Sequence, residues 1–173
     1  GLERIREFVL KLRTFSRLDE GERKGVSVAD CVDSVLTILG HRLRERIEVE
    51  TRIGEPKLLD CYPSLLNQAL MNLLSNAIDA IEGAGRIVIE GGASGENYVL
   101  RVRDSGSGIP EAVRERIFDP FFTTKEVGKG TGLGLSITYS IIKKHGGTLE
   151  LKSGEAGGTV AEIMLPLAGP PGT

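Results

Sequence analysis

The stretch from Ser64 to Ile81 constrains the fold of this chain more than any other part of the sequence. It is predominantly apolar, with no lysine, arginine or glutamate and a single charge, at Asp79. Apolar residues recur in it at helical spacing, so it predicts a long helix that other elements of the fold cover. Its polar residues fall in one stripe, at i, i+3, i+4 and i+7: Asn72, Ser75, Asn76 and Asp79.

This polar stripe has two interpretations, a solvent face or the wall of a pocket. A solvated helix face is normally richer in charge. Asparagine is also a poor residue inside a helix, because its amide competes for backbone hydrogen bonds. The composition therefore favours a pocket wall, and neutral amide oxygens suit Mg²⁺ that bridges phosphates.

The segment YVLRVRDSGSGIP predicts a strand followed by a glycine-rich turn. Every second residue from Tyr98 shares the apolar face, so Asp104 ends that face. An unpaired carboxylate there would be costly, and we expect Asp104 to have a hydrogen-bond donor. Gly106 and Gly108 let the backbone approach that partner closely. A local turn, in which Asp104 binds its own loop, stays open as the alternative.

A glycine run, GKGTGLGLS from Gly128 to Ser136, opens the next predicted helix. Its spacing matches neither a Walker A loop nor a dinucleotide fingerprint. A helix N-terminus offers free N–H groups and a positive dipole end to an anion, so the run favours a phosphate site.

Composition limits the remaining classes. The chain has 173 residues, 40% hydrophobic and 27% charged, with a net charge of −2. This balance predicts one domain with a real core and gives no case for nucleic acid or a membrane surface as partner. Cys31 and Cys61 form no CxxC pair; reduced thiols are favoured, with a disulfide left open.

The order of predicted elements indicates an α+β fold with helices on one face of a sheet. An amphipathic helix over Leu2–Leu18 packs on its own domain or, as we favour, on a partner helix, and Asp19–Gly25 resembles a linker. Beyond it the sequence predicts helices over 28–46, 64–81, 108–118 and 132–144, and strands over 47–53, 56–62, 86–92, 98–105, 148–153 and 158–166.

Taken together, five motifs in this order resemble the GHKL ATPase superfamily, and within it the catalytic ATP-binding domain of bacterial two-component sensor histidine kinases. NQALMNLLSNAIDAI resembles the N box, DSGSGIP the G1 box, FDPFFTTK the F box, GKGTGLGLS the G2 box and GGTVAEIMLP the closing strand. The resemblance implies a Bergerat-type two-layer α/β sandwich with a mixed, mainly antiparallel sheet. It divides the chain into the end of a dimerisation-hairpin helix (1–20), the catalytic domain (21–166) and a flexible tail (167–173).

The resemblance also implies a site for ATP and Mg²⁺. Asp104 would accept a hydrogen bond from the adenine amino group, Asn76 would bind Mg²⁺ and Asn72 would lie beside the phosphates. Residues 118–131 would form the ATP lid. The full set of implied ATP-binding residues is Asn72, Asn76, Asp79, Ala80, Asp104, Gly106, Gly108, Ile109, Phe118, Thr124, Lys125, Lys129, Gly130, Thr131, Gly132, Leu133, Gly134, Leu135 and Thr159.

Two departures from the family pattern qualify this assignment. Many histidine kinases carry lysine or arginine where this chain has Asp79 or Ala80, so Lys125 and Lys129 become the better candidates for offsetting phosphate charge. The phosphoacceptor histidine is also absent, and we interpret His41 and His145 as structural. We therefore expect this chain to bind ATP but not to autophosphorylate alone.

The leading functional hypothesis is phosphoryl transfer from ATP to a histidine on the dimerisation hairpin of the same kinase, a homodimer in full length, with relay to a response regulator receiver domain. An ATP-hydrolysing conformational switch and a non-catalytic nucleotide-binding regulator are the alternatives. The switch proteins carry a glutamate where this chain has Asn72, which favours the transferase. We expect a cytoplasmic domain without direct membrane or nucleic-acid contact, and an anchor elsewhere in the full-length protein stays open.

Overall fold

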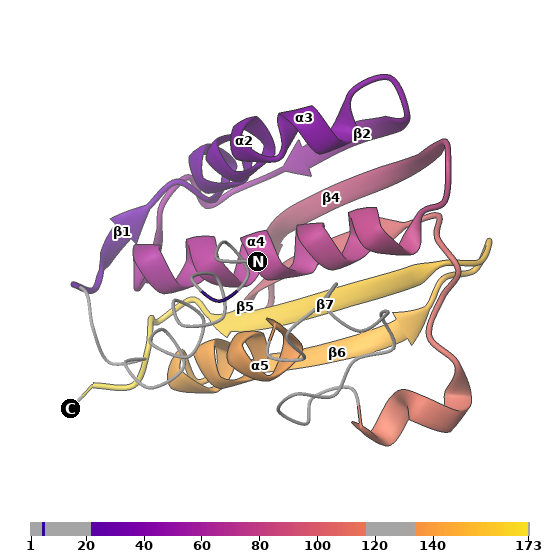
Figure 1. The fold of residues 1–173 in the computed structure, drawn as a ribbon. Helices are drawn as coiled ribbons and strands as arrows, with labels where there is room; N and C mark the ends of the chain where they lie inside the picture. Colours follow the sequence, from indigo (N-terminus) through magenta and orange to yellow (C-terminus); the bar gives the residue numbers. More distant parts are fainter. Residues whose placement is uncertain (1–4, 6–21, 117–133, 173) are drawn as a thin grey trace.

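The computed structural model describes residues 5, 22–116 and 134–172, which form a sheet with helices on one face (Figure 1). The strands are β1 (Lys24–Val26), β2 (Ile47–Ile53), β3 (Leu59–Cys61), β4 (Gly85–Ser94), β5 (Asn97–Asp104), β6 (Thr148–Ser153) and β7 (Thr159–Pro166). The helices are α2 (Val28–Ile38), α3 (Gly40–Leu43), α4 (Pro63–Ala80) and α5 (Gly134–Lys144), with a 3-10 helix, η1, at Glu111–Arg116.

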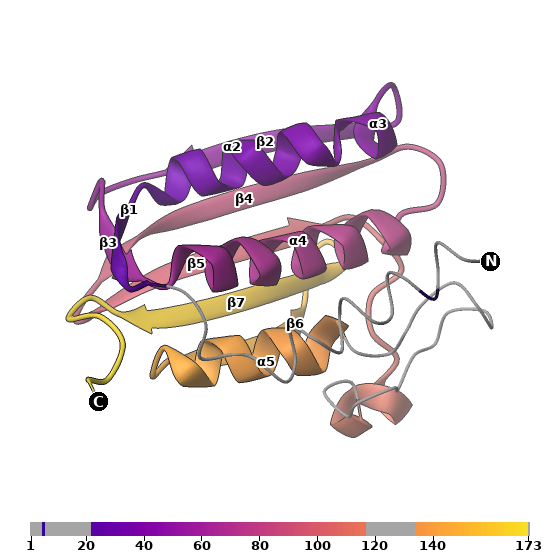
Figure 2. The ribbon, with the colours of Figure 1, turned by 60° about the vertical axis from the view of Figure 1, so that its left-hand side comes forward.

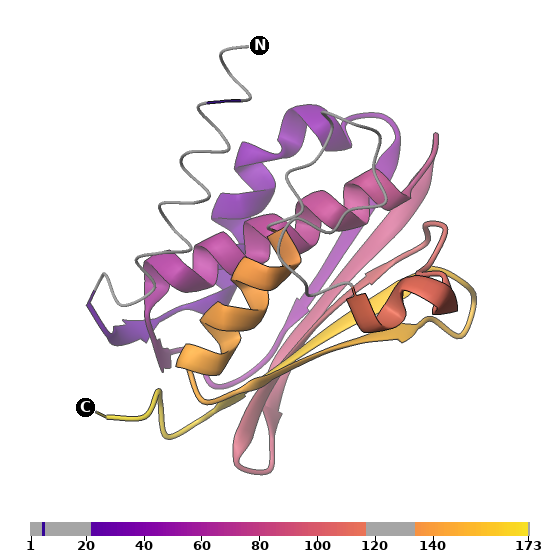
Figure 3. The ribbon, with the colours of Figure 1, turned by 60° about the horizontal axis from the view of Figure 1, so that its bottom comes forward.

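Five strands form the main sheet, in the order β2-β4-β5-β7-β6, and β1 pairs with β3 in a small second sheet. Neighbouring strands of the main sheet are antiparallel except β2 and β4, which are parallel. Because the connection between β2 and β4 contains α4, this helix crosses the sheet. The structure confirms the predicted mixed, mainly antiparallel sheet with helices on one face, as Figure 3 shows.

The core lies between the sheet and three helices, which run side by side over it (Figure 2). Helix α4 contacts α2 on one side and α5 on the other. Its large buried side chains each contribute about 1.5–3 kcal/mol of hydrophobic stabilisation. They are Leu65, Leu66, Leu70, Leu73, Leu74 and Ile78.

Charged side chains pair between strands on the opposite face of the main sheet. Arg101 binds Glu162 at 2.7 Å, and Arg103 binds Glu90 at 2.8 Å. The arginines alternate along β5 with the buried Leu100 and Val102, as the two-residue period of a strand requires. This alternation explains why the helices cover only one face.

The predicted helix over 28–46 is divided into α2 and α3. Ser27 caps α2 by accepting a hydrogen bond from the Asp30 amide at 3.1 Å, whereas Leu39 ends the helix just before Gly40. Glycine has a weak helix propensity, which favours a break here. Glu45 then adopts a φ of 60° and turns the chain into β2.

The small sheet involves part of the segment expected to be a linker. Lys24 of β1 lies opposite Cys61 of β3. The adjoining Arg23 donates to the Asp60 carboxylate at 2.9 Å and to the Pro170 carbonyl at 2.8 Å. The described part of the expected tail is therefore attached to the domain, and Leu167 packs against the core. The expected hairpin helix over 1–20 lies outside the described residues, apart from the exposed Ile5.

Candidate functional site

The polar stripe of α4 occupies the part of the helix that follows its N-terminal turns. The helix begins with Pro63, which is favourable at a first helical position. Asn72 is only 6% exposed, Asn76 is half-buried and Asp79 is exposed. The stripe therefore runs from the interior toward the surface, as a pocket wall would.

Asn72 joins α4 to the first turn of α5. Its Nδ2 donates to the Gly134 carbonyl at 3.2 Å and to the Thr138 hydroxyl at 3.3 Å. Its Oδ1 accepts from Gln68 at 3.2 Å, and the Thr138 hydroxyl donates to the same Gly134 carbonyl at 2.8 Å. The amide thus positions the helix that follows the glycine run, a role that the stripe pattern alone did not reveal.

Asp104 lies at the end of β5, half-buried, and both of its hydrogen bonds fall on one oxygen. Its Oδ1 accepts from the Gly106 amide at 2.9 Å and from the Thr159 amide at 3.3 Å. Burial raises the pKa of Asp104, and these two hydrogen bonds oppose the shift. Within residues 22–116 and 134–172 no donor reaches Oδ2, so this oxygen can still accept a hydrogen bond from a ligand.

The local turn that we kept as an alternative is therefore present, but it leaves the second carboxylate oxygen, Oδ2, available to a ligand. The Gly106 bond is such a turn, since it spans two residues. The Thr159 bond comes from β7, 55 residues away in the chain. The two donors fix the orientation of the Asp104 side chain, which is what a recognition carboxylate needs.

Close backbone contacts bring the Asp104 turn onto the C-terminal end of α4. The Ser107 amide donates to the Ala80 carbonyl at 3.0 Å, and a Cβ added at Gly106 would lie 2.4 Å from that oxygen. Gly158 adopts a φ of +74°, and a Cβ there would lie 1.9 Å from the Asp104 carbonyl. Glycine at both positions lets α4, the turn and β7 meet at one place.

The structure thus unites some of the predicted site residues and leaves others apart. Asn72 contacts Gly134, the amides of Gly106 and Thr159 bind Asp104, and Ala80 contacts Gly106. Gly108 faces Gly158 across 3.4 Å, measured from an added Cβ. Ile109 is half-buried and Leu135 packs against the core. Eight predicted residues lie outside the described residues: Phe118, Thr124, Lys125, Lys129, Gly130, Thr131, Gly132 and Leu133.

Two arginines that lie near the end of α4 were not identified from the sequence. Arg42 of α3 forms an ion pair with Asp79. Arg46 donates to the carbonyls of Ile81 at 3.0 Å and Gly83 at 2.7 Å, and so caps the helix. Both arginines come from a segment more than 30 residues upstream, and no local pattern in the sequence links them to α4.

His145 has a structural position, as expected. The ring is 1% exposed, its Nδ1 lies 2.8 Å from the Ile141 carbonyl, and its Nε2 accepts from the Tyr62 amide at 3.1 Å. Burial lowers the pKa of His145, and the two contacts suit a neutral ring whose Nδ1 donates and whose Nε2 accepts. His41 is exposed on α3.

The cysteines are both free thiols in the core, at Cys31 and Cys61, in accord with the favoured interpretation. Burial raises the pKa of Cys61 to about 12, which makes a thiolate unfavourable there.

The donor set limits how a metal could bind. No group of three or more His, Cys, Asp or Glu side chains in the described part of the chain could hold a metal ion. The amide-bearing stripe fits instead an ion such as Mg²⁺, which keeps waters and shares its coordination with phosphates.

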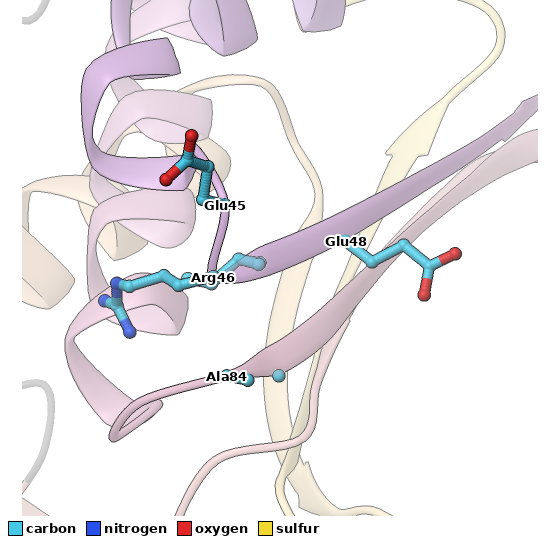
Figure 4. Close-up of a pocket in the computed structure, with 6 residues that line it drawn as sticks. Glu45, Arg46, Glu48 and Ala84 are labelled. Carbon is cyan, nitrogen blue, oxygen red and sulfur yellow. The ribbon is translucent and has the colours of Figure 1, made fainter.

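A surface cavity of about 390 Å³ lies elsewhere, between the turn before β2 and the start of β4. Figure 4 shows that Glu45, Arg46 and Glu48 point in different directions from it. The Arg46 side chain is already used to cap α4. This cavity has no convergent polar groups, and we do not assign it a ligand.

None of the described helices combines the length and apolar character that a membrane span requires.

Comparison with known proteins adds independent findings. Residues 61–169 match the family described as histidine kinase-, DNA gyrase B-, and HSP90-like ATPase. The sensor kinase CckA of Brucella abortus is 35% identical over an alignment that covers 94% of this chain and 19% of CckA. The chain spans a third or less of the length of the curated relatives that it matches.

Solved structures give the same picture. The catalytic domain of histidine kinase ThkA, in a nucleotide-free form, superposes with a TM-score of 0.76 at 32% identity, covering 84% of this chain and 97% of that domain. A crystal structure of ThkA in complex with response regulator protein TrrA gives a TM-score of 0.79 at 28% identity, covering 95% of this chain and 48% of ThkA.

Proposed function

The chain belongs to the family of histidine kinase-, DNA gyrase B- and HSP90-like ATPases, and from this premise we propose that it binds Mg–ATP and transfers the γ-phosphoryl group to a histidine. The acceptor lies on the dimerisation hairpin of a two-component sensor kinase, of which residues 1–20 are the end. The phosphoryl group then passes to the receiver domain of a response regulator.

One observation carries the nucleotide site: the Asp104 turn packs directly on the end of α4. The Ser107–Ala80 hydrogen bond of 3.0 Å joins the two elements. A ligand held by Asp104 therefore lies beside the polar stripe. Asp104 accepts the adenine amino group through Oδ2, while its Oδ1 stays bound to the backbone.

The metal comes with the nucleotide in this proposal. Asn76 would hold Mg²⁺ through its amide oxygen, a neutral hard ligand of the kind that this ion accepts beside phosphates. The ion supplies charge neutralisation for the phosphates when it is bound. Asn72 holds the first turn of α5 in place through Gly134 and Thr138.

The rival function is an ATPase that acts as a conformational switch. Hydrolysis needs a base or a water-positioning group. Asn72 occupies the position where the switch proteins carry a glutamate, and its amide is bonded to Gly134, Thr138 and Gln68. An amide cannot take a proton from water, and this favours phosphoryl transfer.

Transfer from γ-labelled ATP tests the proposal. We expect the chain alone to keep no label and release little phosphate. On mixing with a separate hairpin domain that carries the acceptor histidine, acid-labile label should appear on the hairpin and not on the chain. The same hairpin with the histidine replaced by glutamine is the control. Rapid phosphate release by the chain alone would favour the switch, and label on His41 or His145 would contradict their structural assignment.

A further inference from the structure

The polar stripe of α4 includes one negatively charged residue, Asp79, and the proposed ligand, ATP, carries several negative charges on its phosphates. Asp79 follows Asn76 by three residues, and such residues are neighbours on a helix surface. A polyphosphate bound along the stripe would therefore meet a like charge within about one helical turn, and this arrangement needs a cation nearby.

Arg42 supplies a cation at this place. Its Nη2 contacts Oδ1 of Asp79, and the two side chains are 33% and 30% exposed. A guanidinium has five N–H donors in a planar fork. Among the described residues the Asp79 carboxylate is its hydrogen-bond partner, so the remaining donors of Arg42 can bind a second anion.

Six other described arginines are engaged elsewhere. Arg46 is committed to the backbone carbonyls at the end of α4, and Arg23 is committed to Asp60 and the C-terminal segment. A further group pairs with glutamates of the main sheet: Arg52, Arg86, Arg101 and Arg103. Arg42, by contrast, reaches the polar stripe through its contact with Asp79.

We propose that Arg42 is a nucleotide-binding residue that contacts the phosphate chain, with Asp79 as the group that positions its guanidinium. This inference rests on the proposed function. It assigns recognition of the anionic end of the nucleotide to α3, while Asp104 recognises the base. The cation that the sequence pattern leads one to expect on α4 thus comes from a different helix.

Calorimetric titration of the 173-residue chain with Mg–ATP and with adenosine tests this assignment. Arg42→Gln should weaken Mg–ATP binding about 10- to 150-fold, the range expected for loss of a charge-assisted hydrogen bond. Adenosine binding should change by less than about twofold, because surface charges contribute little to a neutral ligand. Arg44→Gln is the matched control, since Arg44 is exposed in the same segment; Arg42→Lys, which keeps the charge without the fork, should bind with intermediate affinity.

The same substitution in an Asp79→Asn chain distinguishes direct contact of Arg42 with the phosphates from an effect of Arg42 on the charge of Asp79. In Asp79→Asn chains, Arg42→Gln should still weaken Mg–ATP binding. Equal affinities of Asp79→Asn and the double variant would overturn the proposal, because Arg42 would then act only on Asp79. Unchanged Mg–ATP affinity in Arg42→Gln, or equal losses for ATP and adenosine, would overturn it too. A wild-type chain that binds neither ligand would instead contradict the proposed function, and this inference with it.

Discussion

Replacing Asp104 by asparagine should separate ligand binding from stability. The asparagine Oδ1 can accept both backbone hydrogen bonds that Asp104 Oδ1 accepts now, from Gly106 at 2.9 Å and Thr159 at 3.3 Å. The substitution therefore alters only the other terminal atom of the side chain, where the Nδ2 donor of asparagine replaces the Oδ2 acceptor of aspartate. A ligand amino group that binds there loses a charge-assisted hydrogen bond and meets another donor.

The expected loss of ATP affinity follows from this exchange. A hydrogen bond to a charged group contributes about 1.5–3 kcal/mol, which corresponds to about 10- to 150-fold in the dissociation constant. Stability should behave differently. Burial raises the pKa of Asp104, which means that the folded state disfavours its charged form at neutral pH. The variant removes this penalty, so its free energy of unfolding should equal or exceed that of the wild type within about 1 kcal/mol.

The pH dependence has a defined sign. A carboxyl group whose pKa is raised on folding costs stability above that pKa, and the cost disappears as the pH falls through it. Any stability advantage of Asp104→Asn should therefore shrink on acidification, because the wild-type group becomes protonated.

Two measurements on the same samples check the reasoning: calorimetric titration with Mg–ATP and urea unfolding at several pH values. Asp33→Asn is the control, since Asp33 is an exposed carboxylate on α2 and the charge change is identical. Unchanged ATP affinity in Asp104→Asn would refute the assignment of Oδ2 to the ligand. A loss of stability well above 1 kcal/mol would instead show that the carboxylate is mainly structural.

Three further predictions concern the groups around the site. Gly158→Ala should destabilise the domain by about 2–5 kcal/mol, because the new Cβ would lie 1.9 Å from the Asp104 carbonyl at a φ of +74°. The control is Gly157→Ala, at a φ of +93° with no atom within 4 Å. It should destabilise the domain by only about 1–2 kcal/mol, as measured by urea unfolding of both variants. Thr138→Val should lower the free energy of unfolding by about 1–3 kcal/mol, because it leaves the buried Asn72 amide and Gly134 carbonyl each short of a partner. The control is Thr37→Val on the exposed side of α2, which also removes a hydrogen bond from a hydroxyl to a carbonyl one turn back. It should change the free energy of unfolding by no more than about 0.5 kcal/mol. Burial lowers the pKa of His145, so the unfolded chain takes up a proton first and stability should fall as the pH drops below about 6.5; a His145→Gln variant with an equally steep pH profile would contradict this.

Regular patterns in the sequence predicted much of the fold. The apolar periodicity of 64–81 located α4 within one residue at each end. Alternation along the segment that became β5 placed Asp104 at the end of the buried face. These signals are local, because each depends on residues of a single element.

The remaining features depend on partners distant in sequence. Strand β1 has three residues, and it exists through its pairing with β3. The hydrogen bonds from Asn72 to Thr138 and from Thr159 to Asp104 span 66 and 55 residues. Residues 108–118 were expected to form a short helix, and its described part, after Pro110, has the tighter 3-10 form. No property of the separate segments specifies these contacts.

The small sheet of β1 and β3 lies at the N-terminal end of α4. Strand β3 ends at Cys61, and α4 begins two residues later, at Pro63. Helix α4 has 18 residues, so it spans about 27 Å. The chain before β1 therefore joins the domain at one end of a rigid rod, and the Asp104 turn rests on the other end. A tilt of α4 about its β3 end would therefore displace the Asp104 turn by an amount that grows with the length of the helix.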